Sequence, residues 1–220
     1  EGDVWVHTLQ VVDEAAVLIR DLAGDRPRAL TVMLASLCHD LGKPGTTTHE
    51  DDGHIRSRGH EEAGIPPTTA LLDRWNVHTL LGYDVRAQVF ALVAQHLKPG
   101  LLYDDRDRVS DGAIRRLARK VEPDLLYRVA KADCLGRRPG RFEPVAMDWF
   151  RERVRRLEVE IRPPDPILRG RDVLALGVAP GPEVGRIVKA VYELQLDGKV
   201  TTLEEARAEA QRILGSSQSE

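Results

Sequence analysis

Apolar residues recur at helical spacing along almost the whole chain, and this periodicity constrains the fold more than any other feature. Between Asp3 and Leu22, for example, Val4, Val11, Leu18 and Leu22 recur at intervals of seven and four residues. Residues spaced in this way lie on one face of an α-helix, and the strict alternation that predicts a half-buried strand is nearly absent. The sequence therefore predicts an all-α fold.

The same pattern predicts further helices with recognisable ends. Residues 30–41 form a dense apolar run that is long enough for a buried helix. Ser110 is a suitable N-cap, Pro123 suits a first helical position, and Thr202 with Glu205 fits a capping box. The other predicted helices span residues 60–75, with a break or kink at Pro66-Pro67, and residues 84–97, 110–121, 123–135, 145–161, about 184–194 and 202–214.

Two stretches without a helical pattern organise the chain. Residues 42–59 are rich in glycine and polar side chains and predict a long loop, which inside a compact domain is usually functional or mobile. Residues 162–166, Arg-Pro-Pro-Asp-Pro, predict a stiff linker. We therefore predict a helical bundle over residues 1–161 and a short helical appendage over residues 162–220, with a disordered tail from residue 215.

Composition excludes several classes of protein. The 220 residues contain 32 Lys and Arg against 35 Asp and Glu, a net charge of −3 that excludes a uniformly basic nucleic-acid binder. Residues 110–160 carry 13 basic and 9 acidic residues, a local charge of +4, so their arginines either meet phosphates or form a solvated helix face. No run of about 18 uncharged apolar residues exists, so we expect no membrane span.

The cysteines and the N-terminus bear on cellular location. Cys38 and Cys134 are too few and too far apart for a disulfide framework or a paired-cysteine zinc site, which predicts a reducing, cytoplasmic setting. The first residues, Glu-Gly-Asp-Val-Trp, lack the basic and apolar segments of a signal peptide. Such an abrupt start is expected of a fragment of a longer protein.

Six side chains of metal-ligand type fall on or beside different predicted helices: His7, His39, Asp40, His60, His96 and Asp133. Imidazole and carboxylate together suit transition metals such as Mn, Fe, Co, Ni or Zn. The His39-Asp40 pair ends the dense apolar helix, where an ionised carboxylate is costly to bury without a cation or another partner. Any one of these histidines is also compatible with a structural role, so the prediction of a metal site depends on the whole set.

The spacing of these six residues and the short sequence motifs around them resemble the HD superfamily of metal-dependent phosphohydrolases. The motifs are Leu-Cys-His-Asp-Leu-Gly-Lys at 37–43, Gly-His-Glu-Glu-Ala-Gly at 59–64 and Ala-Asp-Cys-Leu-Gly-Arg at 132–137. More narrowly, they resemble the HD portion of bacterial tRNA nucleotidyltransferases (CCA-adding) and related poly(A) polymerase-like proteins. Residues 168–173 and 176–185 also resemble the C-terminal segment of that family. The paired-aspartate motif of that family's nucleotidyltransferase head is not in this sequence. We therefore expect a missing N-terminal domain and no nucleotide addition by this chain alone.

This resemblance implies a centre of two divalent ions, of Mn, Ni, Co, Fe or Zn. It assigns a first ion to His7, His39, Asp40 and Asp133, and a second to His60 and His96 with Asp40 bridging. It also implies that Asp40 and Lys43 are catalytic, with Lys43 neutralising charge on the phosphoryl group. A surface lysine favoured by a helix C-terminus is the alternative for Lys43. Arg137 and Arg138 follow Asp133 closely enough to bind a substrate phosphate.

These residues predict a metal-dependent phosphohydrolase that acts on phosphate esters. By resemblance, the substrates are RNA 3′ ends, tRNA or nucleotides, and the activity is that of a 2′,3′-cyclic phosphodiesterase or 2′-phosphatase. A non-catalytic helical module that docks tRNA is the alternative, and hydrolysis of free nucleotides without any role in RNA is a third. Because a scaffold need not keep six metal ligands, the intact set favours the enzyme.

Overall fold

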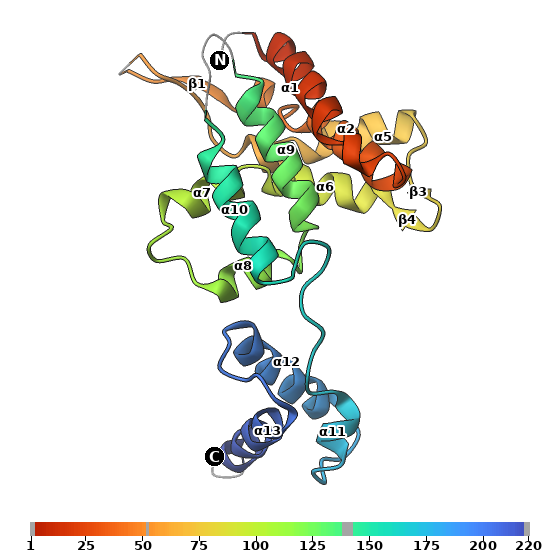
Figure 1. Ribbon diagram of the computed structural model, residues 1–220, viewed down its shortest axis with the longest axis vertical. Coiled ribbons are helices and arrows are strands. Elements are labelled where there is room, and N and C mark those ends of the chain that lie inside the picture. The colour runs from red at the N-terminus through yellow and green to blue at the C-terminus, as the bar shows by residue number, and fades with distance from the viewer. Residues whose placement is uncertain (1–2, 52, 138–142, 218–220) are drawn as a thin grey trace.

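The computed structural model of the chain describes residues 3–51, 53–137 and 143–217 (Figure 1). The predicted all-α class is confirmed, because helices carry nearly all of the regular structure. Four of them form the centre of the bundle: α1 (Val4–Leu18), α2 (Arg26–Cys38), α6 (Val85–Gln95) and α9 (Pro123–Leu135). None of the helices in the described ranges is long and apolar enough to cross a membrane.

The four central helices contact one another through fully buried apolar side chains. Helix α2 contacts α1, α6 and α9, and α1 also contacts α9. Val11, Val32, Leu92 and Leu126, one from each central helix, are all inaccessible to solvent and belong to one core cluster. Burying a side chain of this size stabilises the fold by about 1.5–3 kcal/mol. The helix ends that carry the candidate ligands are therefore held by a rigid core.

Further elements surround this centre. They are α3 (Lys43–Thr46), α4 (His60–Ala63), α5 (Ile65–Arg74), α7 (Lys98–Asp104), α8 (Asp111–Leu117), α10 (Val145–Arg156), a 3₁₀ turn at Arg20–Leu22, and the hairpins β1 (Thr47–His49) with β2 (Ile55–Ser57) and β3 (Thr79–Leu80) with β4 (Tyr83–Asp84).

Several predicted helix ends agree with the structure. The Ser110 side chain accepts a hydrogen bond from the Ala113 amide, and Pro123 is the first residue of α9. Thr202 and Glu205 bond each other's amides reciprocally, which is the predicted capping box.

Other expectations differ in detail. Residues 42–59, predicted as a loop, contain α3 and the β1–β2 hairpin, in which Thr47 pairs with Ser57. The predicted 60–75 helix divides at Gly64 into α4 and α5, with Pro66 in the first turn of α5, where its missing amide hydrogen costs nothing. Helix α7 was not predicted.

Residues 168–214 form a second apolar cluster of their own. Helices α11 (Gly170–Leu174), α12 (Pro182–Leu196) and α13 (Leu203–Ser217) gather at one end of the molecule, beyond the segment that follows α10 (Figure 1). Leu168, Val173, Ile187 and Ala206 are buried among them. The predicted division of the chain at residue 161 stays a proposal. Helix α13 extends through Ser217, and the rest of the predicted disordered tail lies outside the described residues.

Helix α8 of the bundle contacts α12 of this second cluster through charged groups. Arg116 forms ion pairs with Glu193 at 2.9 Å and with Asp197 at 2.7 Å, and Arg119 pairs with Glu193 at 2.6 Å. Arg115 donates a hydrogen bond to the Leu196 carbonyl at 2.8 Å. We call this contact the α8–α12 joint.

Candidate metal centre

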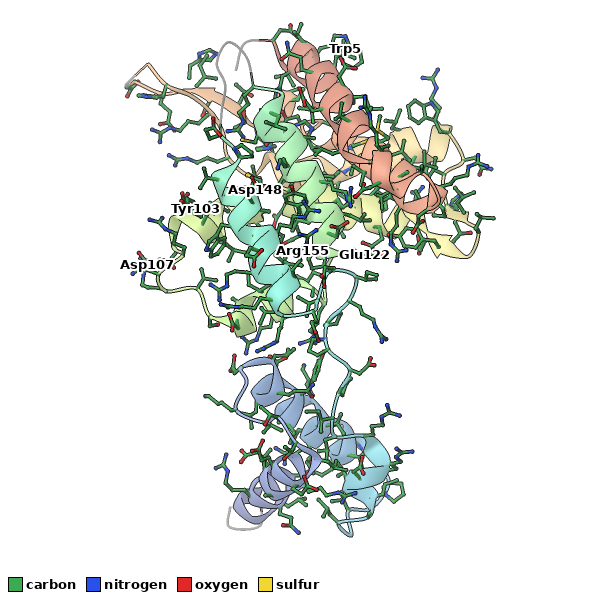
Figure 2. All side chains as sticks on the ribbon, viewed as in Figure 1. Trp5, Tyr103, Asp107, Glu122, Asp148 and Arg155 are labelled. Carbon is green, nitrogen blue, oxygen red and sulfur yellow. The ribbon has the colours of Figure 1, made fainter. Side chains whose placement is uncertain are left out.

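The six candidate ligands, which lie up to 126 positions apart in the sequence, meet at one place. Helix α1 supplies His7, the end of α2 supplies His39 and Asp40, the start of α4 supplies His60, the end of α6 supplies His96, and α9 supplies Asp133. Each is at most 7% exposed. Trp5, only two residues before His7, points away from the bundle and is 61% exposed (Figure 2), because residues two apart on a helix face different directions.

The ligand atoms form two adjacent groups, and Asp40 faces both. One group is His7, His39 and Asp133, and the other is Asp40, His60 and His96; within each group the ligand atoms lie within 4.8 Å of one another. Asp40 Oδ2 lies 3.2 Å from His39 Nε2 and 3.7 Å from His7 Nε2, while Asp40 Oδ1 lies 3.3 Å from His60 Nε2. The two oxygens of one carboxylate are thus divided between the two groups.

All four histidines of the candidate centre turn Nδ1 toward a backbone carbonyl. The contacts are His7 to Gly136 at 3.4 Å, His39 to Ser36 at 2.8 Å, His60 to Ser57 at 2.6 Å and His96 to Val93 at 2.7 Å. A carbonyl oxygen only accepts hydrogen bonds, so each Nδ1 carries a hydrogen in these contacts. In the neutral imidazole Nε2 then presents a lone pair, which is the usual arrangement of a histidine that binds a metal.

The lone pairs converge on each other and on carboxylate oxygens. His60 Nε2 lies 3.2 Å from His96 Nε2, and His39 Nε2 lies 3.2 Å from Asp40 Oδ2. Two acceptors this close and this buried repel each other unless a proton or a metal ion lies between them. Nitrogen and carboxylate oxygen are the donors that divalent transition metals prefer. These residues therefore fit a divalent metal.

The electrostatics of the site also favour cations. Burial raises the pKa of Asp40, but hydrogen bonds from His39 and His60 outweigh it and hold that pKa well below its usual range. Burial lowers the pKa of His39, and the carboxylates of Asp40 and Asp133 reverse that shift and raise it. Burial, followed by the positive charge of protonated His39, lowers the pKa of His96 to about 4. The two carboxylates are thus ionised and attract positive charge to the centre.

Two glycines let neighbouring segments of the chain come close enough together to form the site. A Cβ on Gly42 would lie 2.0 Å from the His60 carbonyl oxygen, so only glycine lets the turn after α2 touch the start of α4. A Cβ on Gly136 would lie 2.7 Å from the Val11 side chain, so glycine also lets the end of α9 contact α1. The Gly136 carbonyl is the group that His7 faces, and the contact between these two helices orients that ring.

The predicted catalytic and substrate-binding cations flank the ligands. Lys43 is buried, and its Nζ lies 2.7 Å from Asp40 Oδ2, so it is not the surface lysine that was the alternative. Arg137 forms an ion pair with Asp133 Oδ2 at 3.0 Å. Arg138, the other predicted phosphate contact, lies outside the described residues.

A cavity of about 890 Å³ opens above this centre. Asp40, His60, His96 and Asp133 are at its inner surface together with Lys43 and Arg137, and its wall is lined by Val4, Thr47, His49, Ile55, Arg56, Ser57, Arg58, Gly59, Glu61, Leu97 and Leu101. A volume in the range of 300–1,000 Å³ is typical of small-molecule sites. The wall residues Ile55, Arg56, Arg58 and Leu101 were not singled out from the sequence, because neither the β1–β2 hairpin nor α7 was predicted.

Much of the basic cluster at residues 110–160 forms internal ion pairs. Arg116 and Arg119 contact α12, Arg128 is buried beside Asp21 and Asp124, and Arg153 pairs with Asp111. The sequence left open whether these arginines meet phosphates or face solvent. For these four, the structure gives a third answer, which is intramolecular pairing.

Comparison with known proteins agrees with this geometry. The sequence model of the HD domain matches residues 4–137, which is more than half of the chain and includes all six candidate ligands. The chain belongs to the HD domain family, and the resemblance predicted from the sequence is confirmed.

The chain is also similar in sequence to tRNA nucleotidyltransferases. The chain is 35% identical to the A-adding tRNA nucleotidyltransferase of Deinococcus radiodurans, over 94% of this chain and 47% of that protein. It is 34% identical to the CC-adding tRNA nucleotidyltransferase of Thermus thermophilus, over 93% of this chain and 43% of that protein. The chain thus spans less than half the length of these relatives. No solved structure matches it.

Proposed function

We propose that this chain is a metal-dependent phosphohydrolase that cleaves phosphate esters at RNA ends or in nucleotides, of the 2′,3′-cyclic phosphodiesterase or 2′-phosphatase type, and that it acts in the cytoplasm. The observation that supports this most is the pair of ligand groups at the inner end of a cavity that also contains Lys43 and Arg137. Buried ligands alone serve a structural metal equally well. Ligands beside an open cavity with cations suit an anionic substrate.

In this proposal two divalent ions, of Mn, Ni, Co, Fe or Zn, are held side by side. His7, His39 and Asp133 would hold the first ion, His60 and His96 would hold the second, and Asp40, which faces both groups, would be shared by the two. When bound, the ions supply a water of lowered pKa as the nucleophile and positive charge beside the phosphoryl oxygens.

Lys43 and Arg137 act on the substrate rather than on the metals. Both already contact ligand carboxylates, Asp40 and Asp133, so their charged groups lie within reach of a phosphate bound beside these carboxylates. Arg137 binds non-bridging oxygens with its planar guanidinium, and Lys43 neutralises the charge that develops during cleavage.

Metal analysis of protein purified without chelator, followed by a screen of phosphate esters, tests the proposal. The screen includes nucleoside 2′,3′-cyclic phosphates, 2′-phosphates and 5′-nucleotides, each assayed with and without a chelator. We expect chelator-sensitive release of phosphate or ring opening. A metal-loaded protein that hydrolyses none of these esters contradicts the proposal.

Anomalous scattering from crystals soaked in excess Mn or Co tests the number of ions. We expect two peaks about 3.5–4 Å apart, as in other two-metal sites. The second site, which has fewer carboxylates, is expected to bind more weakly. One peak, with His60 and His96 turned away from it, contradicts the binuclear centre.

The similarity to tRNA nucleotidyltransferases supports a second candidate. In it, this chain is a non-catalytic helical module that docks tRNA for a nucleotidyltransferase head at its N-terminal side. This candidate predicts tRNA binding that survives replacement of the metal ligands, whereas the phosphohydrolase predicts hydrolysis that does not. Measuring both on an Asp133→Ala variant separates the two.

A further inference from the structure

The β1–β2 hairpin forms one wall of the cavity and is attached directly to the candidate metal centre. Thr47 Oγ1 and Ser57 Oγ lie 2.8 Å apart across the two strands. The Ser57 carbonyl accepts a hydrogen bond from His60 Nδ1 at 2.6 Å. The strand that orients a candidate metal ligand is therefore also the strand that faces the substrate.

Two arginines flank this anchor point, one on each side of Ser57. Arg56 and Arg58 both line the cavity, and their side chains are 39% and 75% exposed. Each pairs with Glu50, at 3.1 Å and 3.5 Å, and Glu50 is not part of the cavity lining. Ion pairs this exposed contribute about 0–1 kcal/mol, so a phosphate can compete with Glu50 for both guanidinium groups.

The cations of the cavity therefore form two tiers. The inner tier, Lys43 and Arg137, contacts the ligand carboxylates, whereas the outer tier, Arg56 and Arg58, lies along the hairpin wall. A ligand with a single phosphate occupies only the inner tier. The next phosphate of a nucleic-acid strand needs a second cationic position farther from the reacting one, and strands carry one charge per nucleotide.

We infer that Arg56 and Arg58 form a second phosphate subsite, which makes the end of an oligonucleotide, rather than a mononucleotide, the preferred substrate. This inference rests on the proposed phosphohydrolase function and names the substrate class for that site.

The test uses metal-loaded protein and a ligand that is not cleaved. A fluorescein-labelled tetranucleotide ending in a 3′-methylenephosphonate, whose P–C bond resists hydrolysis, is titrated by fluorescence anisotropy at 0.1 M NaCl. The matching nucleoside 3′-methylenephosphonate is measured as a competitor. We expect the Arg56→Ala, Arg58→Ala double variant to bind the tetranucleotide about tenfold more weakly and the nucleoside within about twofold of the wild type.

Two further variants control for folding and for general electrostatics. Arg56→Lys with Arg58→Lys keeps the charge and is expected to recover part of the lost affinity. Arg186→Ala with Arg212→Ala removes the same charge from two exposed arginines that also pair with glutamates but do not line the cavity. An equal loss in this control, an equal loss for both ligands, or no loss for the tetranucleotide overturns the subsite.

Hydrolysis of a nucleoside 2′,3′-cyclic phosphate by the wild type is measured in parallel. If this ester is cleaved and the tetranucleotide shows no dependence on the hairpin, the subsite fails and the proposed function stands. If nothing is cleaved but the hairpin-dependent binding persists, the proposed function fails and the subsite stands as a site for a nucleic-acid strand.

Discussion

Charged groups meet in two contrasting settings in this chain, the candidate metal centre and the α8–α12 joint. At the centre, Asp40 and Asp133 are almost inaccessible to solvent, and their charges are balanced by imidazoles and cations within 4 Å. At the joint, Arg116 and Glu193 are more than a third exposed and pair across two helices. Buried charge interacts strongly because little water screens it, and surface charge interacts weakly. The comparison teaches that burial, more than residue type, decides how strongly charged groups act on one another and on a cation between them.

The largest expected effect comes from removing the carboxylate that faces both ligand groups. Asp40→Ala should lower hydrolysis by more than about 10³-fold, because its two carboxylate oxygens face histidines of both groups. Steady-state kinetics and metal content measure this, and circular dichroism checks that the protein stays helical. Asp73→Ala, at an exposed carboxylate on α5, is the matched control and should keep full activity. Activity above a few per cent of wild type in the folded Asp40 variant would show that Asp40 is not shared.

A buried apolar substitution in each cluster tests whether the two regions are separate cooperative units. Ile187→Ala and Leu126→Ala each remove a fully buried side chain and should cost about 2–5 kcal/mol. If residues 162–220 are a separate domain, Ile187→Ala should unfold that region in urea and leave hydrolysis of a nucleoside cyclic phosphate intact. Leu126→Ala should destabilise the bundle and reduce activity with it. A single shared transition in both variants would count against the division at residue 161.

Lys43→Ala separates binding of the metals from action on the substrate. Turnover should fall by about 10²-fold, since the lysine is proposed to neutralise charge on the phosphoryl group, while the metal content stays near that of the wild type. Metal analysis and kinetics on the same preparation measure both quantities. Lys98→Ala, at an exposed lysine outside the cavity lining, should change neither. Parallel loss of metal and activity would assign Lys43 to the metal site instead.

The smallest expected effect concerns the joint and its dependence on pH. The hydrogen bond from Arg116, followed by that from Arg119, holds the pKa of Glu193 below its ordinary value of 4.5. A carboxyl group whose folded pKa is lowered stabilises the fold above its unfolded pKa, and that contribution is lost as the pH falls through the folded value. Glu193→Gln should therefore destabilise the joint by less than about 1 kcal/mol at neutral pH, and the difference should vanish in acid.

Urea unfolding of the C-terminal region at pH 7 and at pH 3.5, each in 0.05 M and 1 M NaCl, measures this effect. High salt should reduce the difference at pH 7, because it screens exposed pairs. Glu204→Gln, at the exposed start of α13, is the control. A cost that persists in 1 M NaCl would mean that the joint depends on packing rather than on charge.

The sequence by itself determined the helical class, most helix ends and the six ligand types. Helical periodicity and caps such as Ser110 depend on neighbours within one or two turns, so they can be inferred without knowledge of the fold. The short sequence motifs around His39, His60 and Asp133 also indicated the family, because each motif lies at or near a helix end and contains a glycine.

The tertiary structure alone decided which atoms face one another. No local pattern indicates that Asp40 divides its two oxygens between two groups, or that the end of α9 supplies the carbonyl that His7 on α1 faces. The tertiary structure also decided which partners the arginines have. Arg116 pairs with Glu193, which is 77 positions away in the sequence. Arg56 and Arg58 line the cavity because they lie in a hairpin, where the sequence predicted a loop. These contacts join residues far apart in the sequence, and their energies depend on burial and on distances between atoms. Both quantities exist only once the chain has packed.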